Sequence, residues 1–188
     1  HTGDVFVRDG KIESISTNSL DVDVPTIDCE GCIIAPGLID IHVHFREPSS
    51  GKHEETILSG AASAAQGGFT TVCTMPNTTP AMDTPEQIAA SVAIGQATGF
   101  CRVLPTCCAT VGRHGEALAP IDAMCQAGAI AITDDGDVVE CDDLMLASLQ
   151  RAKANNVPFM QHCQDPAMTI GGVMHAGEVQ ESLGYGAW

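Results

Sequence analysis

The sequence predicts an α/β protein in which parallel strands alternate with helices, as in an incomplete (β/α)8 barrel of the TIM type. Apolar runs of strand length recur at a spacing of about 27 to 32 residues, the length of one strand–helix repeat. These runs are apolar almost throughout, as expected for strands of a parallel sheet that is covered on both faces. The segments between them have helical composition.

Residues 1–36 are expected to form an N-terminal β segment that belongs to a small side domain, part of a β-sandwich. Residues 4–12 indicate two strands around a turn at Asp9-Gly10. A further pair of short strands is expected to flank residues 29–34. Cys29 and Cys32 form a CxxC pair, but no second pair and no paired histidines follow at zinc-finger spacing. We therefore interpret this pair as part of the strand edge.

Residues 37–188 are expected to be the N-terminal portion of a barrel that is truncated at its C-terminus. The predicted strands cover residues 38–43, 70–74, 102–106, 129–133 and 158–161, and the predicted helices cover 54–66, 84–97, 120–127 and 142–154. These make about five βα units, whereas a closed barrel has eight and about 250 residues. An open doubly wound sheet could stop at five, so the number of units alone leaves both architectures open. Residues 171–188 are rich in glycine and indicate a loop. We expect further sequence or another segment to complete the fold.

Composition restricts the partners. The chain has 24 acidic and 8 basic residues, a formal net charge of −16. Because a nucleic-acid interface needs a basic surface, this balance opposes one, and it also disfavours anionic membranes. No run approaches the roughly 18 to 20 apolar residues of a membrane-spanning helix. The nine cysteines lack a regular spacing, which favours free thiols in a reducing compartment. We expect a cytoplasmic protein that binds neither nucleic acid nor membranes.

Two histidines end the first predicted barrel strand. Alternate side chains of a strand point to the same face, so His42 and His44 lie side by side. Two imidazoles at the end of an apolar strand, followed by Arg46, favour a metal-binding edge over two unrelated histidines.

The ends of later strands carry further ligand types. Asp134 and Asp135 follow the fourth predicted strand, and His162 follows the fifth. Taken alone, the first pair could mark only a turn, and His162 could be an ordinary core residue. The C-terminal ends of all strands of a parallel barrel converge on one rim, however, where catalytic groups collect. Two histidines, one carboxylate and a third histidine on that rim form a nitrogen and oxygen ligand set suited to one or two Zn²⁺ ions.

Several motifs together carry a resemblance to a known family. Residues 42–48 (HVHFREP), 74–78 (TMPNT), 133–136 (TDDG) and 162–163 (HC) resemble the dihydroorotases of the bacterial barrel type, within the amidohydrolase superfamily. The PGLID lead-in at 36–40 and GGFTT at 67–71 fit as well. The resemblance runs over essentially the whole chain but covers a little under half of a usual family member.

The resemblance implies a role for each matching residue. His42 and His44 bind the more buried metal ion and His162 the second, and Asp135 takes the place that a carboxylated lysine occupies in relatives. Asp135 is preferred over Asp134 because its interval from His162 fits the family pattern. Arg46 and Asn77 match the pair that holds the substrate's carboxylate. A guanidinium can grip a carboxylate through two hydrogen bonds, and Asn77 after Pro76 could also serve only to form a turn.

The implied reaction is the interconversion of N-carbamoyl-L-aspartate and dihydroorotate in pyrimidine synthesis. The family's general acid/base and one more histidine ligand are expected beyond Trp188, so this chain is not expected to be catalytically complete. A homodimer or a complex with aspartate transcarbamoylase is implied as the assembly. Two alternatives stay open: another cyclic amidase (dihydropyrimidinase, hydantoinase or allantoinase-like) and a non-catalytic dihydroorotase-like scaffold for transcarbamoylase. His53, His114 and His175 are expected to be ordinary surface residues.

Overall fold

The computed structural model describes residues 2–18, 23–49, 51 and 54–188, and the chain divides into two compact units, His1–Pro36 and Gly37–Trp188. Among the described residues, no helix is both long enough and apolar enough to cross a membrane.

The first unit contains a β-hairpin. Strand β1 (Asp4–Arg8) pairs antiparallel with β2 (Lys11–Ser16), and Arg8 lies opposite Lys11. The two residues between them, Asp9 and Gly10, both have left-handed backbone angles, with φ of 51° and 71°. This is the geometry of the two-residue turn that suits the twist of a hairpin, and Asp-Gly adopts it readily. The predicted hairpin is confirmed.

The second pair of strands expected in this unit, on either side of residues 29–34, was a wrong prediction. The described residues there form a turn, in which Cys32 N donates to Cys29 O at 2.9 Å, and no strand. Ile33 is 94% exposed. A strand exists only when a neighbouring strand pairs with its backbone, and no described segment does so here. Among the described residues of this unit, the hairpin β1-β2 is therefore the β-structure present, and the β-sandwich stays a prediction.

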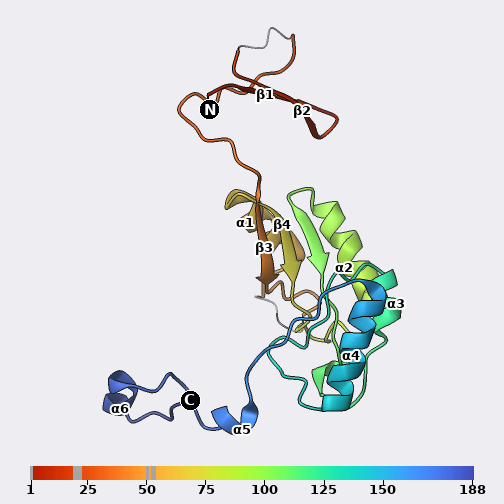
Figure 1. Cartoon of the computed structure of the whole chain (residues 1–188), viewed down its shortest axis with the longest axis vertical. Coiled ribbons are helices and arrows are strands. Elements are labelled where there is room, and N and C mark those ends of the chain that lie inside the picture. The colour runs from red at the N-terminus through yellow and green to blue at the C-terminus, as the bar shows by residue number, and fades with distance from the viewer. Residues whose placement is uncertain (1, 19–22, 50, 52–53) are drawn as a thin grey trace. The chain divides into compact units, whose positions relative to one another are not determined.

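The second unit is built on a parallel sheet, as the βα repeat predicts. Three strands lie in the order β3-β4-β5, and two helices connect them in sequence, so each strand is followed by a helix on the way to its parallel neighbour (Figure 1). The elements are β3 (Leu38–Val43), α1 (Ile57–Gln66), β4 (Phe69–Thr74), α2 (Pro85–Thr98) and β5 (Arg102–Pro105).

Both connecting helices begin at capping boxes that are visible in the sequence. Thr56 caps α1 together with Ser59, and Thr84 caps α2 together with Gln87. Each threonine side chain accepts from a backbone N–H of the first turn, and each partner side chain accepts from the threonine N–H in return. These reciprocal bonds explain why the helices begin at residues 57 and 85.

The fourth and fifth predicted strands occupy their expected places but pair only briefly. Ile132 forms an isolated parallel bridge to Cys107 on one side and to Phe159 on the other. Hydrogen bonds from Ile132 N to Pro158 O at 3.0 Å and from Met160 N to Ile132 O at 2.9 Å continue the parallel pattern. Neither segment is long enough to form a strand in the structure, so the prediction of five full units is corrected to three strands and two bridged segments.

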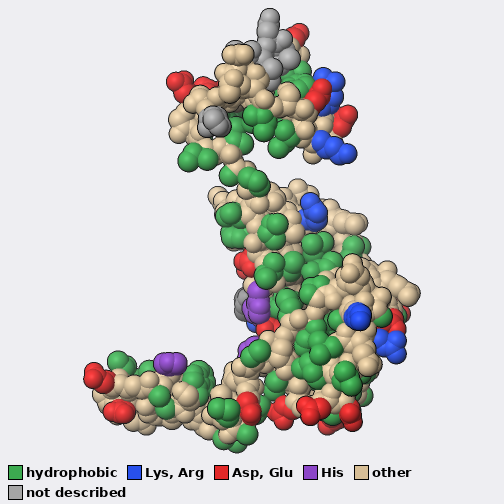
Figure 2. Space-filling model, viewed as in Figure 1, with side chains coloured by type: hydrophobic (Ala, Val, Ile, Leu, Met, Phe, Trp, Pro, Cys, Tyr) green, Lys and Arg blue, Asp and Glu red, His purple; other side chains and the backbone are tan. Residues whose placement is uncertain are grey.

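The remaining elements follow in chain order. They are the 3₁₀ turn η1 (Val111–Arg113) and the helices α3 (Ile121–Gln126), α4 (Asp142–Asn155), α5 (Pro166–Thr169) and α6 (Glu178–Leu183). Helices α1 to α4 pack successively against one another. Figure 2 shows acidic side chains gathered at the end of this unit where α4 begins, and Glu140, Asp142 and Asp143 are exposed there. The expectation of a plain loop over 171–188 was wrong, because helix-forming residues between Gly177 and Gly184 fold into α6.

The core lies between the sheet and its helices, and the barrel is not closed. One cluster of buried side chains consists of Phe45, Ile57, Ala61, Val72 and Val103, and a second surrounds Ile88, Met124 and Ile132. In the sheet order β3 is an edge strand, and its Leu38, Ile39 and Ile41 are more than half exposed. A closed barrel would pair this edge with another strand.

Candidate metal centre

The two histidines of the HxH motif lie at the C-terminal end of β3. His42 is in the strand, His44 follows it, and their ring centroids are 5.1 Å apart. Because the residues are two positions apart in an extended chain, both rings reach the same side. Their side chains are 50% and 36% exposed, so both remain open to a ligand.

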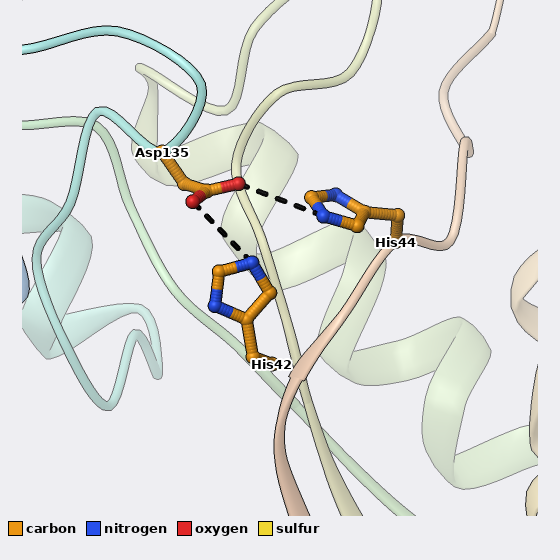
Figure 3. Close-up of side chains that lie close together, drawn as sticks. All are labelled: His42, His44 and Asp135. Atoms are coloured by element: carbon orange, nitrogen blue, oxygen red, sulfur yellow. Dashed lines mark ion pairs between the residues drawn. The ribbon is translucent and has the colours of Figure 1, made fainter. Parts of the chain in front are cut away.

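Asp135 meets both histidines, although it comes from the loop after the fourth predicted strand (Figure 3). Its Oδ1 lies 3.3 Å from His42 Nε2, and its Oδ2 lies 3.6 Å from His44 Nε2. The Asp135 side chain is only 8% exposed. The tertiary structure thus brings one carboxylate oxygen to each imidazole, although the histidines and Asp135 are about 90 residues apart in the chain.

This arrangement fits a zinc ion by its donor atoms and their spacing. One ligand atom from each of the three residues lies within 4.8 Å of the others. Two ligands bound at about 2.0 to 2.1 Å in tetrahedral geometry are about 3.4 Å apart, close to both histidine–carboxylate distances. Imidazole nitrogens with a carboxylate are a usual donor set for Zn²⁺. The three residues could therefore hold a metal ion with little rearrangement.

Asp134, the other carboxylate of the pair, is buried on the opposite side of the backbone. Its Oδ1 accepts from the backbone N–H groups of Ala109 at 2.8 Å and Thr110 at 3.2 Å, and its Oδ2 accepts from the Thr110 hydroxyl. Burial raises the pKa of the Asp134 carboxyl, and the hydrogen bonds from Thr110 and Ala109 offset part of that rise. The bonds also tie the loop that carries Asp135 to the segment after β5.

His162 is not part of the three-residue group. It lines a cavity of about 240 Å³ together with Arg113, His114, Asp137 and Gln164. Gly136, the residue after Asp135, also lines this cavity, so the cavity begins beside the histidine–aspartate group. His162 thus shares a cavity with the neighbour of Asp135, but it is not joined to the other three expected ligands.

The remaining histidines were expected to be ordinary surface residues. His114 and His175 are exposed, as expected for surface residues, while His53 lies outside the described residues. Arg113, next to His114, pairs with Asp137 across the same cavity.

Arg46 and Asn77, the expected substrate-binding pair, lie against each other beside the histidines. Arg46 Nη1 donates to the Asn77 backbone oxygen at 2.8 Å and to Asn77 Oδ1 at 3.0 Å. Asn77 follows β4, so both residues come from loops at the C-terminal ends of adjacent strands. Within the described part of the chain, the hydrogen bonds of the Arg46 side chain involve Nη1 alone, which leaves Nη2 and Nε for another group.

Sequence reasoning missed two features of the site. It treated Asp134 only as an alternative ligand, whereas the structure shows a buried anchor for the ligand loop. The alternation of side chains in a strand could not have shown this, because the two aspartates open a turn in which Asp137 N donates to Asp134 O at 2.8 Å. The contacts of Asn77 with the histidine–aspartate group left no signal in the sequence.

The chain is similar to known proteins of one family. A dihydro-orotase-like family model matches residues 31–187. The dihydroorotases of Aquifex aeolicus and Bacillus cytotoxicus are 41% and 40% identical to the chain over 181 residues. That of Solibacter usitatus is 42% identical over 174 residues. The alignments cover 96%, 96% and 93% of this chain but 42%, 42% and 40% of the relatives, so the chain spans less than half of their length.

A solved structure supports the fold independently. The L-hydantoinase (dihydropyrimidinase) from Arthrobacter aurescens superposes with a TM-score of 0.66 at 24% identity, over 84% of this chain and 36% of that protein. At that identity the likeness concerns the fold alone. The family model, in contrast, covers most of the chain and includes the HxH and Asp-Asp-Gly motifs. The chain belongs to the dihydroorotase-like family.

Proposed function

We propose that the protein is a zinc-dependent dihydroorotase that interconverts N-carbamoyl-L-aspartate and dihydroorotate in pyrimidine synthesis. The observation that carries this proposal is the group of His42, His44 and Asp135 within 4.8 Å, with Arg46 held beside it through Asn77. A metal-ligand group suits hydrolysis of an amide, and a neighbouring guanidinium suits a substrate that carries a carboxylate.

In this proposal His42, His44 and Asp135 hold zinc, and His162 contributes to a second ion at the cavity beside Gly136. A zinc ion held by these residues would supply a bound water whose pKa is lowered to about 7 and a Lewis acid for the ring amide carbonyl. The chain's own residues supply orientation. Asp135 is buried and accepts a hydrogen bond from Asn77 Nδ2 at 3.2 Å, which fixes the carboxylate facing both imidazoles.

Arg46 binds the substrate's carboxylate. The relevant charge is local, because the whole chain carries a formal net charge of −16 and would otherwise repel an anion. The guanidinium is half-buried, and its Nη1 is fixed by two acceptors on Asn77. A guanidinium held at one nitrogen loses less freedom when its remaining donors bind a carboxylate. Asn77 would bind the same carboxylate of the substrate as Arg46.

The alternatives differ in what they require of these residues. Another cyclic amidase would bind a substrate without a carboxylate, and Arg46 would then have no anionic partner. A non-catalytic scaffold would not need the histidine–aspartate group at all. Assembly as a homodimer or with aspartate transcarbamoylase, and a cytoplasmic location, stay predictions from the family resemblance.

The test is dihydroorotate turnover by the full-length gene product, measured together with its zinc content. Wild type should bind zinc and hydrolyse dihydroorotate. His44→Ala should lose both zinc and turnover. Arg46→Ala should keep zinc and raise KM by about 10- to 100-fold, because a hydrogen bond to a charged group contributes about 1.5 to 3 kcal/mol. His175→Ala, which changes an exposed histidine outside the group, is the matched control.

Other results would contradict the proposal. A wild-type protein that purifies without zinc and binds none when it is supplied would favour the scaffold. Hydrolysis of hydantoin or dihydrouracil in place of dihydroorotate would favour another cyclic amidase. Dihydroorotate turnover that neither variant changes would refute the site.

A further inference from the structure

One side chain connects the expected metal ligands with the expected substrate cation. Asn77 Oδ1 lies 3.0 Å from His44 Nδ1, and the same oxygen accepts from Arg46 Nη1 at 3.0 Å. At the other end of the amide, Nδ2 donates to Asp135 Oδ2 at 3.2 Å. All of these contacts come from the residue after Pro76 in the loop that follows β4.

These contacts determine which way the Asn77 amide is oriented and which nitrogen of the His44 ring carries the hydrogen. A guanidinium can only donate, so the atom that faces Arg46 must be the amide oxygen. That oxygen can bind His44 Nδ1 only if Nδ1 carries the hydrogen. A neutral imidazole then has its lone pair on Nε2, the nitrogen that faces Asp135 at 3.6 Å. Nε2 is the atom that a metal ion would need.

The loop that carries Asn77 is held by bonds on both sides, so the amide does not depend on its own contacts for its place. Met75 N donates to Val43 O at 2.9 Å, which keeps the loop beside the end of β3. Thr79 N donates to Pro48 O at 3.2 Å, and Met82 N donates to Pro76 O at 3.0 Å. The Asn77 side chain is therefore presented to the site from a fixed backbone.

We propose that Asn77 is a positioning residue for the metal ligands as well as a substrate contact. Its carbonyl oxygen selects the His44 tautomer and fixes Arg46, and its NH₂ group holds the Asp135 carboxylate. The inference rests on the proposed function, since it takes His44 and Asp135 as ligands and Arg46 as the substrate cation. It goes further by predicting that one amide sets both zinc affinity and substrate affinity.

The prediction separates Asn77 from Arg46, which among the described residues forms no hydrogen bond or ion pair with His44 or Asp135. Asn77→Ala should weaken zinc binding by about 10- to 100-fold, the usual effect of removing a partner that orients a metal ligand. It should also raise KM for dihydroorotate. Arg46→Ala should raise KM and leave zinc affinity unchanged. In the double variant the two effects on KM should be less than additive, because Asn77 acts partly by holding Arg46.

The experiment uses the full-length protein and measures zinc affinity by competition with a chromophoric chelator, and separately kcat and KM for the zinc-saturated enzyme. The visible spectrum of bound Co²⁺ should differ between wild type and Asn77→Ala, because His44 and Asp135 are no longer held in the same orientation. Asn155→Ala is the matched control, since Asn155 Nδ2 donates to Asp122 Oδ1 at 2.7 Å far from the group and its loss should change none of these quantities.

Each outcome decides between the two proposals. If wild type binds no zinc, the proposed function fails. If wild type binds zinc and turns over dihydroorotate while Asn77→Ala retains wild-type zinc affinity and an unchanged Co²⁺ spectrum, the positioning role fails and the function stands. If Asn77→Ala is too unstable to purify, Asn77→Ser replaces it, because serine keeps a turn-forming side chain that is too short to span His44 and Asp135, and the same criteria apply.

Discussion

His42 Nε2 lies 3.3 Å from Asp135 Oδ1, although His42 belongs to the first strand of the parallel sheet and Asp135 follows the fourth predicted one. Imidazole and carboxylate meet because parallel strands direct their C-terminal ends to a common rim. Asp135 is nearly buried and the histidine is half exposed, so a metal ion could approach from the histidine side.

Removal of the shared carboxylate should abolish metal binding. Asp135 is the one carboxylate in the three-residue group found among the described residues, so in Asp135→Ala both imidazoles lose that partner. We expect zinc affinity to fall by about 100-fold or more, since even partners outside the ligand shell contribute 10- to 100-fold. Zinc content after dialysis against a weak chelator measures this, with Glu116→Ala as an exposed acidic control outside the cavity that His162 lines. Equal zinc content in both variants would remove Asp135 from the ligand set.

The neighbouring aspartate should matter for stability. Asp134→Ala leaves the backbone N–H groups of Ala109 and Thr110 without their buried acceptor. Each unsatisfied buried donor costs about 1 to 3 kcal/mol, so the free energy of unfolding in urea should fall by at least that amount. Asp134→Asn keeps one oxygen and should lose less. An unchanged unfolding midpoint in Asp134→Ala would mean that the hydrogen bonds of Asp134 do not stabilise the fold.

Helix α1 should tolerate no side chain at Gly60. A Cβ atom there would overlap the buried Phe45 ring, which directly follows His44. Helix propensity alone predicts that alanine stabilises this position by about 1 kcal/mol, whereas forcing extra atoms into a packed core costs about 1 to 3 kcal/mol. We expect Gly60→Ala to lower the thermal midpoint. Gly67→Ala is the control, because its Cβ would meet nothing closer than 3.4 Å at a φ of −79°. A higher midpoint for Gly60→Ala would show that Phe45 moves freely.

The cysteines should differ in reactivity according to burial. Burial raises the pKa of the Cys108 thiol, and burial together with the nearby Asp40 raises the pKa of Cys73. Both thiols should therefore stay protonated at pH 8 and resist iodoacetamide, since the thiolate is the reactive form. The exposed Cys32, Cys141 and Cys163 should be labelled first. Mass spectrometry of native protein measures the order, and labelling in denaturant shows that all nine can react. Early labelling of Cys108 would contradict the buried core.

Much of the fold was predictable because its signals are local. The hairpin at Asp9-Gly10, the capping threonines and the apolar strands of the parallel sheet each depend on a few neighbouring residues. The absence of strands around residues 29–34 was not predictable, because a strand depends on a pairing partner that the local sequence does not reveal.

By itself, the sequence determined the alternation of strands and helices, the family motifs and the face shared by His42 and His44, all of which follow from the period of an extended chain. The family resemblance already favoured Asp135 over Asp134 as the ligand. The tertiary structure alone decided that Asp134 is a buried anchor, that His162 lines the adjacent cavity, and that Asn77 touches both sides of the site. Such contacts join loops that are distant in the chain, and they depend on where each strand ends in the sheet, which no local pattern specifies.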